Sequence, residues 1–165
     1  MPPATADTWL FALTFLTALG CALIAGIFLA FSSFVMGALA RISPPSGIAA
    51  MQAINVVVLN PLFLGLFMGT ALACAVLLVY ALMHWQMPAA LCLAAGSLCY
   101  VVGTFGVTMV FNVPRNNALA RMEPSGSEAA AYWPGYVSSW TMWNHVRTAA
   151  GLVAAALLVW ALVRL

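Results

Sequence analysis

The sequence has very little charge and no lysine at all. Its charged residues are five arginines and three acidic residues, so charged side chains make up 5% of the 165 residues, whereas an ordinary soluble domain has roughly 25%. Hydrophobic residues make up 65%. A soluble enzyme and a disordered chain are excluded, and a net charge of +2 is too small for a nucleic-acid-binding protein. The composition indicates an integral membrane protein.

Two chemical patterns are also missing. The four cysteines, Cys21, Cys74, Cys92 and Cys99, include no Cys-x-x-Cys pair, which argues against a disulfide oxidoreductase. No acidic residue lies inside a predicted span, so an iron site of two histidines and a carboxylate is excluded and a zinc site lacks ligands. We predict no metal site and no cofactor, with haem on a single axial histidine as the open alternative.

Long uncharged apolar segments are what the sequence has in abundance. Residues 8–40 and 42–114 carry no formal charge, and a spanning helix needs about 20 apolar residues. Because the alternating polarity of barrel strands is missing, the sequence predicts one all-α transmembrane domain over 1–165, a four-helix bundle with up-down-up-down topology. We expect helices near 8–39, 53–83, 88–112 and 136–163. Within the hydrophilic loop expected at 113–135, Pro114 favours a short surface helix to about Met122.

An even number of spans places both termini on one side of the membrane. Arg41, Arg115 and Arg121 belong to the two loops on the opposite side, and only Arg164 lies with the termini. Since basic residues are enriched in cytoplasmic loops, we expect the loops in the cytoplasm and the termini outside, in a bacterial inner membrane. The lipid bilayer is the expected partner, and no nucleic acid is expected.

Polar side chains within the apolar segments gather toward the loop side. They are Ser32, Ser33, Gln52, Asn55, Asn60, Thr104, Thr108, Asn112, Asn116, Asn117, Trp140, Asn144, His145, Arg147 and Thr148. Polar groups at membrane depth must be satisfied within the protein. Clustering in one leaflet therefore predicts a pocket that opens toward the two loops.

Arg147 is the most informative single residue. At about 100° per residue it shares one helix stripe with Trp140 and Asn144, and the Trp140 ring can stack on a flat aromatic ligand. One interpretation of Arg147 is an interfacial arginine that extends to the membrane surface. The other is a cation directed at an anionic ligand. Either Glu123 or Glu128 can reach it from the loop.

The two histidines belong to opposite ends of the predicted bundle. His145 is on the loop side and flanks the Arg147 stripe, whereas His84 ends the second predicted helix, so one protomer cannot bring both to one metal. A lone helical histidine is more often a hydrogen-bonded structural residue than a catalytic group. For His145 both interpretations stay open, as does axial ligation of a haem.

Several segments together resemble the anthrone oxygenase-like membrane proteins, the DUF1772 family. They are Gly26-x-Phe-x-Ala-Phe-Ser-Ser33, Ala50-Met-Gln-Ala-Ile-Asn55, Asn60-Pro61, Asn112-Val-Pro-Arg-Asn116-Asn-Ala-Leu and Trp140-x-x-x-Asn144-His145-x-Arg147-Thr. The resemblance spans about residues 20–163. One departure is Arg115, where leucine is usual, and it adds charge beside the expected pocket.

The resemblance implies oxidation of a small phenolic or polycyclic aromatic by O2, as of an anthrone to an anthraquinone, without an obvious cofactor. Such chemistry needs a base, a positive charge near the developing oxyanion and a dry aromatic slot. We assign the base to His145 and the oxyanion contact to Arg147. Substrate binding is assigned to Asn55, Asn112, Asn116, Trp140 and Asn144.

Two other function classes stay open. One is a non-catalytic protein that binds a small anionic or quinone-like ligand, or haem, in the same pocket. The other is a structural or assembly subunit whose polar residues join helices. Gly65 and Gly69 form a GxxxG pair that suits close helix contact, within the bundle or between protomers, so a homo-oligomer is also considered.

Overall fold

The computed structural model describes residues 4–165, with side chains from residue 8 onward, and this part of the chain contains helices and no strand. The α-helices are α1 (Ala4–Ala30), α2 (Met36–Arg41), α3 (Pro44–Val57), α4 (Pro61–Met83), α5 (Ala90–Leu98), α6 (Val113–Ala120) and α7 (Ser127–Leu162). π-Helical segments join some of them, namely η1 (Phe31–Val35), η2 (Cys99–Gly106) and η3 (Thr108–Asn112).

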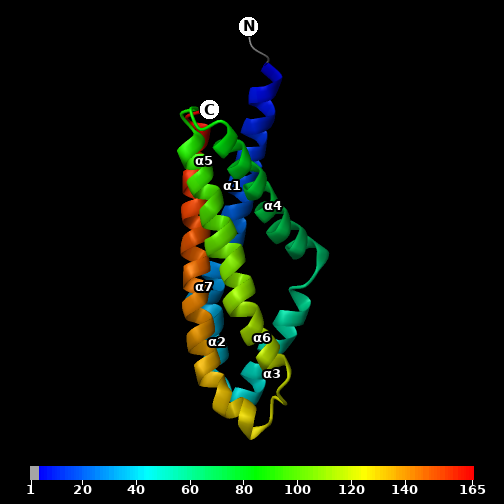
Figure 1. Cartoon of the computed structure of the whole chain (residues 1–165). Helices are drawn as coiled ribbons and strands as arrows, with labels where there is room; N and C mark the ends of the chain where they lie inside the picture. The colour runs from blue at the N-terminus through cyan, green and yellow to red at the C-terminus, as the bar shows by residue number, and fades with distance from the viewer. Residues whose placement is uncertain (1–3) are drawn as a thin grey trace.

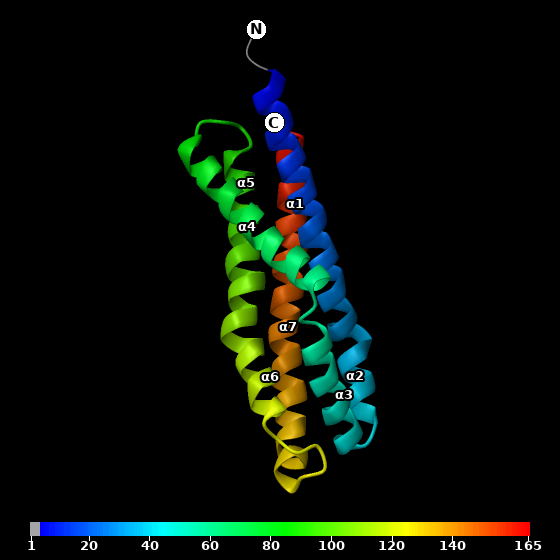
Figure 2. The ribbon, with the colours of Figure 1, turned by 90° about the vertical axis from the view of Figure 1, so that its right-hand side faces the viewer.

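Four helical stretches in the described chain are long and apolar enough to cross a membrane: Thr8–Arg41, Pro61–Met83, Ala90–Ala120 and Ser127–Leu162. They alternate in direction, so the start of α1 and the end of α7 lie at the same end of the bundle (Figure 1). α7 packs against α1 and against the third span, while α4 contacts α1 and α5 and leans away from the bundle toward its first residues (Figures 1 and 2). The prediction of a membrane-spanning helical bundle is confirmed.

The predicted second helix, 53–83, is wrong at its start. Residues 44–57 form a separate helix, α3, and the spanning helix α4 begins at Pro61. Asn60 is extended, with φ −92° and ψ 158°, because a residue before proline avoids the helical region. Its side chain accepts a hydrogen bond of 3.0 Å from the backbone N–H of Phe63 and so caps α4. Residues 40–52, which lie between the first two predicted helices and were expected to form a loop, are therefore mostly helical.

The hydrophilic loop expected at 113–135 is also largely helical. The short helix expected from Pro114 is present as α6, but it continues the third span without a break. α7 begins at Ser127 and includes Pro134, which the sequence placed in the loop. This first part of α7 is helical because its inner face buries Ala129, Trp133 and Tyr136 in a hydrophobic core at the loop end.

Two hydrophobic cores share the bundle. One fills the end that holds the termini and includes Ile24, Leu77 and Leu158. The other lies at the loop end, where α2, α3, α6 and the start of α7 meet. There the Gln52 amide of α3 donates hydrogen bonds of 2.9 Å to the carbonyl oxygens of Leu119 and Met122, at the end of α6. This contact satisfies carbonyls that a helix end leaves free.

The length of α7 exceeds the thickness of the hydrocarbon core of a bilayer. Its 36 residues extend about 54 Å, whereas the hydrocarbon core measures about 30 Å. Trp85 and Trp160 are exposed near the end that holds the termini, as is typical of a membrane interface. Counting about 20 residues from Trp160 along α7 places the other interface near Trp140. The loop-end core then forms a cap at and beyond this second interface.

Some glycines allow two helices of the protomer to pack closely, whereas others face open space. A Cβ added at Gly103 would lie 2.5 Å from the Cβ of Ala150 on α7, whereas one added at Gly65 or Gly69 would meet nothing within 4 Å. The GxxxG pair therefore takes no part in packing within the protomer. A homo-oligomer stays a prediction.

We expect Gly103→Ala to destabilise the bundle, because the Ala150 methyl group cannot rotate away from the added carbon. Overpacking of this kind costs roughly 1–3 kcal/mol. Gly69→Ala is the matched control, since it adds the same methyl group to open space and improves helix propensity by about 1 kcal/mol. Thermal unfolding of both variants in one detergent, followed by circular dichroism, measures the difference. Equal midpoints for the two variants would contradict the close η2–α7 contact.

Candidate functional site

Arg147 lies in the interior of the bundle, between the two cores. Its side chain is 3% exposed. The guanidinium carbon lies 4.0 Å from the centroid of the Phe28 ring and 4.9 Å from that of Trp140, so aromatic rings from α1 and α7 enclose the cation. A ring attracts a cation more strongly when water is excluded. The interpretation of Arg147 as an arginine that extends outward is wrong, because its guanidinium is buried between protein side chains.

The hydrogen bonds of the Arg147 side chain go to neutral groups. Nη2 donates to Oδ1 of Asn144 at 2.5 Å, and Nη1 donates to Oγ1 of Thr108 at 3.3 Å. Nε is enclosed and has no hydrogen-bond partner. Within the described residues no carboxylate pairs with this guanidinium, so the expected approach of Glu123 or Glu128 does not occur. The site therefore holds a positive group with no counter-ion beside it.

Asn144 connects Arg147 to the first span. The residue is fully buried, and its Nδ2 donates hydrogen bonds of 2.6 Å to the Phe28 carbonyl oxygen and to Oγ of Ser32. Because Oδ1 of the same amide accepts from Arg147, one side chain links the guanidinium to η1. The expected stripe of Trp140, Asn144 and Arg147 is thus present, and it faces α1.

The π-helical segments of the described chain flank this cluster. Ser32 is in η1, Thr104 in η2, and Thr108 and Asn112 in η3. The hydroxyl of Thr104 donates to the backbone carbonyl of Arg147 at 3.2 Å. A π-helical turn closes its hydrogen bonds from i to i+5 and frequently marks functional sites. These wider turns bring side chains of the first and third spans to the Arg147 cluster on α7.

Trp140 is held in place on several sides. Its Nε1 donates to Oδ1 of Asn116 at 2.9 Å, and the same oxygen accepts from the Tyr136 hydroxyl at 3.0 Å. The Phe31 ring lies 5.7 Å away, centroid to centroid. Since the side chain is only 5% exposed, the ring packs against Arg147 and Phe31 rather than facing an open slot.

Asn112 and Asn55, two further residues assigned to substrate binding, each have a buried polar atom without a hydrogen-bond partner. Asn112 is 1% exposed and donates from Nδ2 to the Trp140 carbonyl oxygen at 3.2 Å, while its Oδ1 is enclosed without a partner. Asn55 lies beside the Tyr136 side chain, and its Nδ2 is enclosed without a well-formed hydrogen bond. The cluster therefore offers an unused donor on Arg147 and an unused acceptor on Asn112.

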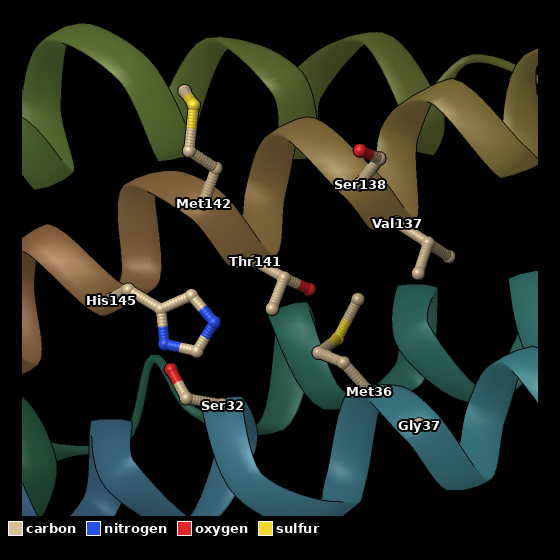
Figure 3. Close-up of a pocket in the computed structure, with 8 residues that line it drawn as sticks. All are labelled: Ser32, Met36, Gly37, Val137, Ser138, Thr141, Met142 and His145. Atoms are coloured by element: carbon tan, nitrogen blue, oxygen red, sulfur yellow. The ribbon is translucent and has the colours of Figure 1, made fainter.

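His145 lies apart from this buried cluster. It is exposed on the outer face of α7 and lines a pocket of about 440 Å³ between α7 and the first span. Ser32, Met36 and Gly37 line the opposite wall, and the Ser32 hydroxyl points toward the His145 ring (Figure 3). Ser32 thus belongs both to this pocket and, through Asn144, to the buried cluster.

His84 lies near the opposite end of the bundle, as expected. It stacks on Tyr80 with ring centroids 4.2 Å apart. Among the described residues no three histidine, cysteine or acidic side chains come together as a metal site would require.

Sequence reasoning missed two residues of the site. In the sequence, Phe28 is one of many apolar residues of the first span, and Ser32 is one of many polar residues on the loop side. Nothing in their spacing indicated a contact with Arg147. The signal that could have found them is their place in the Gly26–Ser33 segment, which carried part of the family resemblance.

Comparison with known proteins places the chain in a family. Residues 63–157 match the family model described as anthrone oxygenase. No curated protein and no solved structure gives a match. The matched region covers more than half of the chain and contains η2, η3 and the part of α7 that carries Trp140, Asn144 and Arg147. The resemblance stated from the sequence is therefore confirmed, and the chain belongs to the anthrone oxygenase family.

Proposed function

We propose that the protein is a membrane-bound oxygenase that oxidises a small phenolic or polycyclic aromatic substrate with O2 in the loop-side leaflet. Family membership supports the reaction class. The observation that carries the proposal is the buried Arg147 guanidinium, which has aromatic and neutral polar neighbours and no carboxylate.

An uncompensated buried cation suits a reaction that develops negative charge. Burying a charge is costly unless it is paired and hydrogen-bonded, and the two rings and two hydrogen bonds offset only part of that cost at Arg147. A fixed positive group in a water-poor site stabilises an oxyanion far more than the same group in water. An enolate formed from a phenolic ketone is such an anion.

The proposed reaction balances without a resident cofactor. A base takes one proton from the methylene carbon of an anthrone-like substrate, and the enolate that forms gives an electron pair to O2. A C–O bond and a peroxide anion result, and the protonated base returns its proton to the peroxide. Loss of the second methylene proton then breaks the O–O bond and leaves a carbonyl and water. The four electrons lost by carbon reduce O2, with one oxygen atom in each product.

We assign the base to His145, because it is exposed, lines the open pocket and has an imidazole nitrogen that can accept a proton. Arg147 supplies the positive potential, and Trp140 and Asn144 hold its guanidinium in position. Asn112 supplies a free acceptor, and Asn116 anchors both the Trp140 and the Tyr136 side chains. Asn55 lies beside the Tyr136 side chain. We place the loop end in the cytoplasm, because it carries three arginines, Arg41, Arg115 and Arg121.

A second candidate is a structural subunit in which these polar groups only join helices. The hydrogen bonds from Asn144 on α7 to Phe28 and Ser32 on the first span favour it. The two candidate functions predict different effects of replacing these polar residues with alanine. The oxygenase loses turnover, whereas the structural subunit loses stability alone.

Oxygen uptake tests the proposal directly. We expect the protein in lipid nanodiscs to consume one O2 for each dihydroxyanthrone converted to the quinone, and isotope-labelled O2 to leave one labelled atom in the new carbonyl. Empty nanodiscs measure spontaneous oxidation of the anthrone. Uptake no faster than in empty nanodiscs, across a panel of phenolic aromatic ketones, would refute the oxygenase proposal.

A further inference from the structure

The Ser32 hydroxyl is the polar group through which the buried cluster reaches the surface pocket. The side chain is half-buried, and its Oγ accepts a hydrogen bond from Asn144 Nδ2. A serine hydroxyl has one proton to donate, and no acceptor for it is found among the residues that the structure describes. Ser32 lines the pocket, and Figure 3 shows its hydroxyl pointing toward the His145 ring.

The hydrogen bonds that lead to Ser32 all run in one direction. Arg147 Nη2 donates to Asn144 Oδ1, and Asn144 Nδ2 donates to Ser32 Oγ. In a chain of this kind each bond polarises the next. The cation at its inner end makes the Ser32 O–H a better donor at the outer end, and hydrogen bonds to ionised acceptors are the strong ones.

We propose that the pocket between η1 and α7 is the substrate site, and that Ser32 donates a hydrogen bond to the ionised oxygen of a lipophilic phenolic substrate. This inference rests on the proposed function. It changes the role expected of Arg147, which acts through Asn144 and Ser32 as a positioning residue. His145 stands across the same pocket as the base.

The size and contents of the pocket suit such a ligand. Small-molecule sites measure about 300–1,000 Å³, and the volume of about 440 Å³ lies within this range. Thr141 contributes an enclosed hydroxyl without a partner. The second pocket, beside α3, has Asn60 as its polar residue, and both polar ends of that side chain are already bonded to the backbone.

The position of the pocket along α7 indicates how the substrate arrives. His145 lies 15 residues before Trp160, or about 22 Å into the bilayer from the interface at the termini, and Val137 lies close to the other interface. The pocket opens on the outer face of the first span and α7, which lipid surrounds. The substrate is therefore an aromatic that partitions into the membrane and enters from the side, with its ionised oxygen against Ser32.

Two substitutions at Ser32 that are isosteric with each other, valine and threonine, test the hydroxyl itself. We expect Ser32→Val to lower kcat by about 10²–10³-fold, the loss typical of one oxyanion donor, and Ser32→Thr, which has the same shape with a hydroxyl, to restore most of it. Ser33→Val is the matched control, because the exposed Ser33 hydroxyl bonds to its own helix at the Leu29 carbonyl. Wild-type kcat in Ser32→Val would overturn the assignment.

Filling the pocket tests its location. A Cβ at Gly37 or at Gly26 meets nothing within 4 Å, so both positions accept a larger side chain, but only Gly37 lines the pocket. We expect Gly37→Phe to weaken binding of a dihydroxyanthraquinone probe at least tenfold and Gly26→Phe to leave it unchanged. Equal affinities for the two variants would overturn the site.

The two proposals fail separately. If the wild type oxidises anthrones and neither Ser32→Val nor Gly37→Phe alters catalysis or probe binding, the site is wrong and the oxygenase stands. If the wild type consumes no O2 but binds the probe in a Gly37-dependent manner, the pocket stands as a binding site. The oxygenase proposal then fails, and with it the role of Ser32 in turnover.

Discussion

Arg147→Ala is expected to lower oxygen-dependent turnover by about 10²-fold, the lower end of the loss typical of one oxyanion donor, because Arg147 strengthens the Ser32 donor through Asn144. The guanidinium is the one charged group in the described cluster, enclosed by the Phe28 and Trp140 rings and bonded to Asn144. Without the guanidinium, the hydrogen-bond chain through Asn144 no longer begins at a cation, and the Ser32 hydroxyl becomes a weaker donor. Initial rates of oxygen uptake, with matched protein amounts in nanodiscs, measure the loss.

The fold is expected to survive this change. Removing the side chain leaves Asn144 Oδ1 and Thr108 Oγ1 without a donor, at roughly 1–3 kcal/mol for each group left unsatisfied. Relief of an unpaired buried charge offsets this cost. We expect native-like helicity and an unchanged elution volume in Arg147→Ala. Full turnover together with a lower unfolding temperature would instead show that Arg147 only joins helices, and would remove it from the reaction.

Arg147→Lys is the informative companion variant. Lysine keeps the charge but presents a compact ammonium group, which cannot reproduce the planar fork of the guanidinium. We expect partial activity, because the positive potential persists while the geometry of the bond to Asn144 changes. Activity equal to that of the alanine variant would show that geometry and not charge dominates at this position.

The membrane-spanning helices could be predicted from the sequence, whereas the local geometry of the site could not. Long uncharged segments determine the spans because a bilayer accepts only satisfied, apolar helices. The break before Pro61 was missed, although the restriction on a residue before proline was available. The helical start of α7, residues 127–135, was missed because its apolar face is short and its burial depends on α3, most of which was predicted as a loop.

The sequence predicted which residues form the cluster better than it predicted how they are arranged. The stripe of Trp140, Asn144 and Arg147 follows from ordinary helix periodicity, and the structure contains it. Ser32 and Thr104 lie in π-helical segments, whose wider turns are not encoded by any periodicity that we used. The interior position of Arg147 depends on a ring from another helix, Phe28, and a tertiary contact of that kind has no local sequence signal.

His145→Ala is expected to lower kcat by about 10²–10⁴-fold, the usual contribution of a general base, with little change in stability. The stability is unaffected because the side chain is exposed and lines the pocket rather than joining helices. Imidazole added at millimolar concentration should restore part of the rate, since the vacated pocket is open to small bases. His84→Ala is the matched control, because it removes an exposed histidine near the other end of the bundle.

Imidazole rescue also separates a base from an axial haem ligand when absorbance is recorded on the same samples. A ligand to haem would be rescued together with the return or shift of an intense Soret band, whereas a base is rescued with no such band in any sample. Substrate deuterated at the methylene carbon adds a second criterion. If His145 removes that proton, His145→Ala makes C–H cleavage the slow step, and the isotope effect on oxygen uptake rises toward its full value. An isotope effect equal to that of the wild type, with turnover undiminished, would remove His145 from the reaction and leave Ser32 as the polar group that the substrate meets.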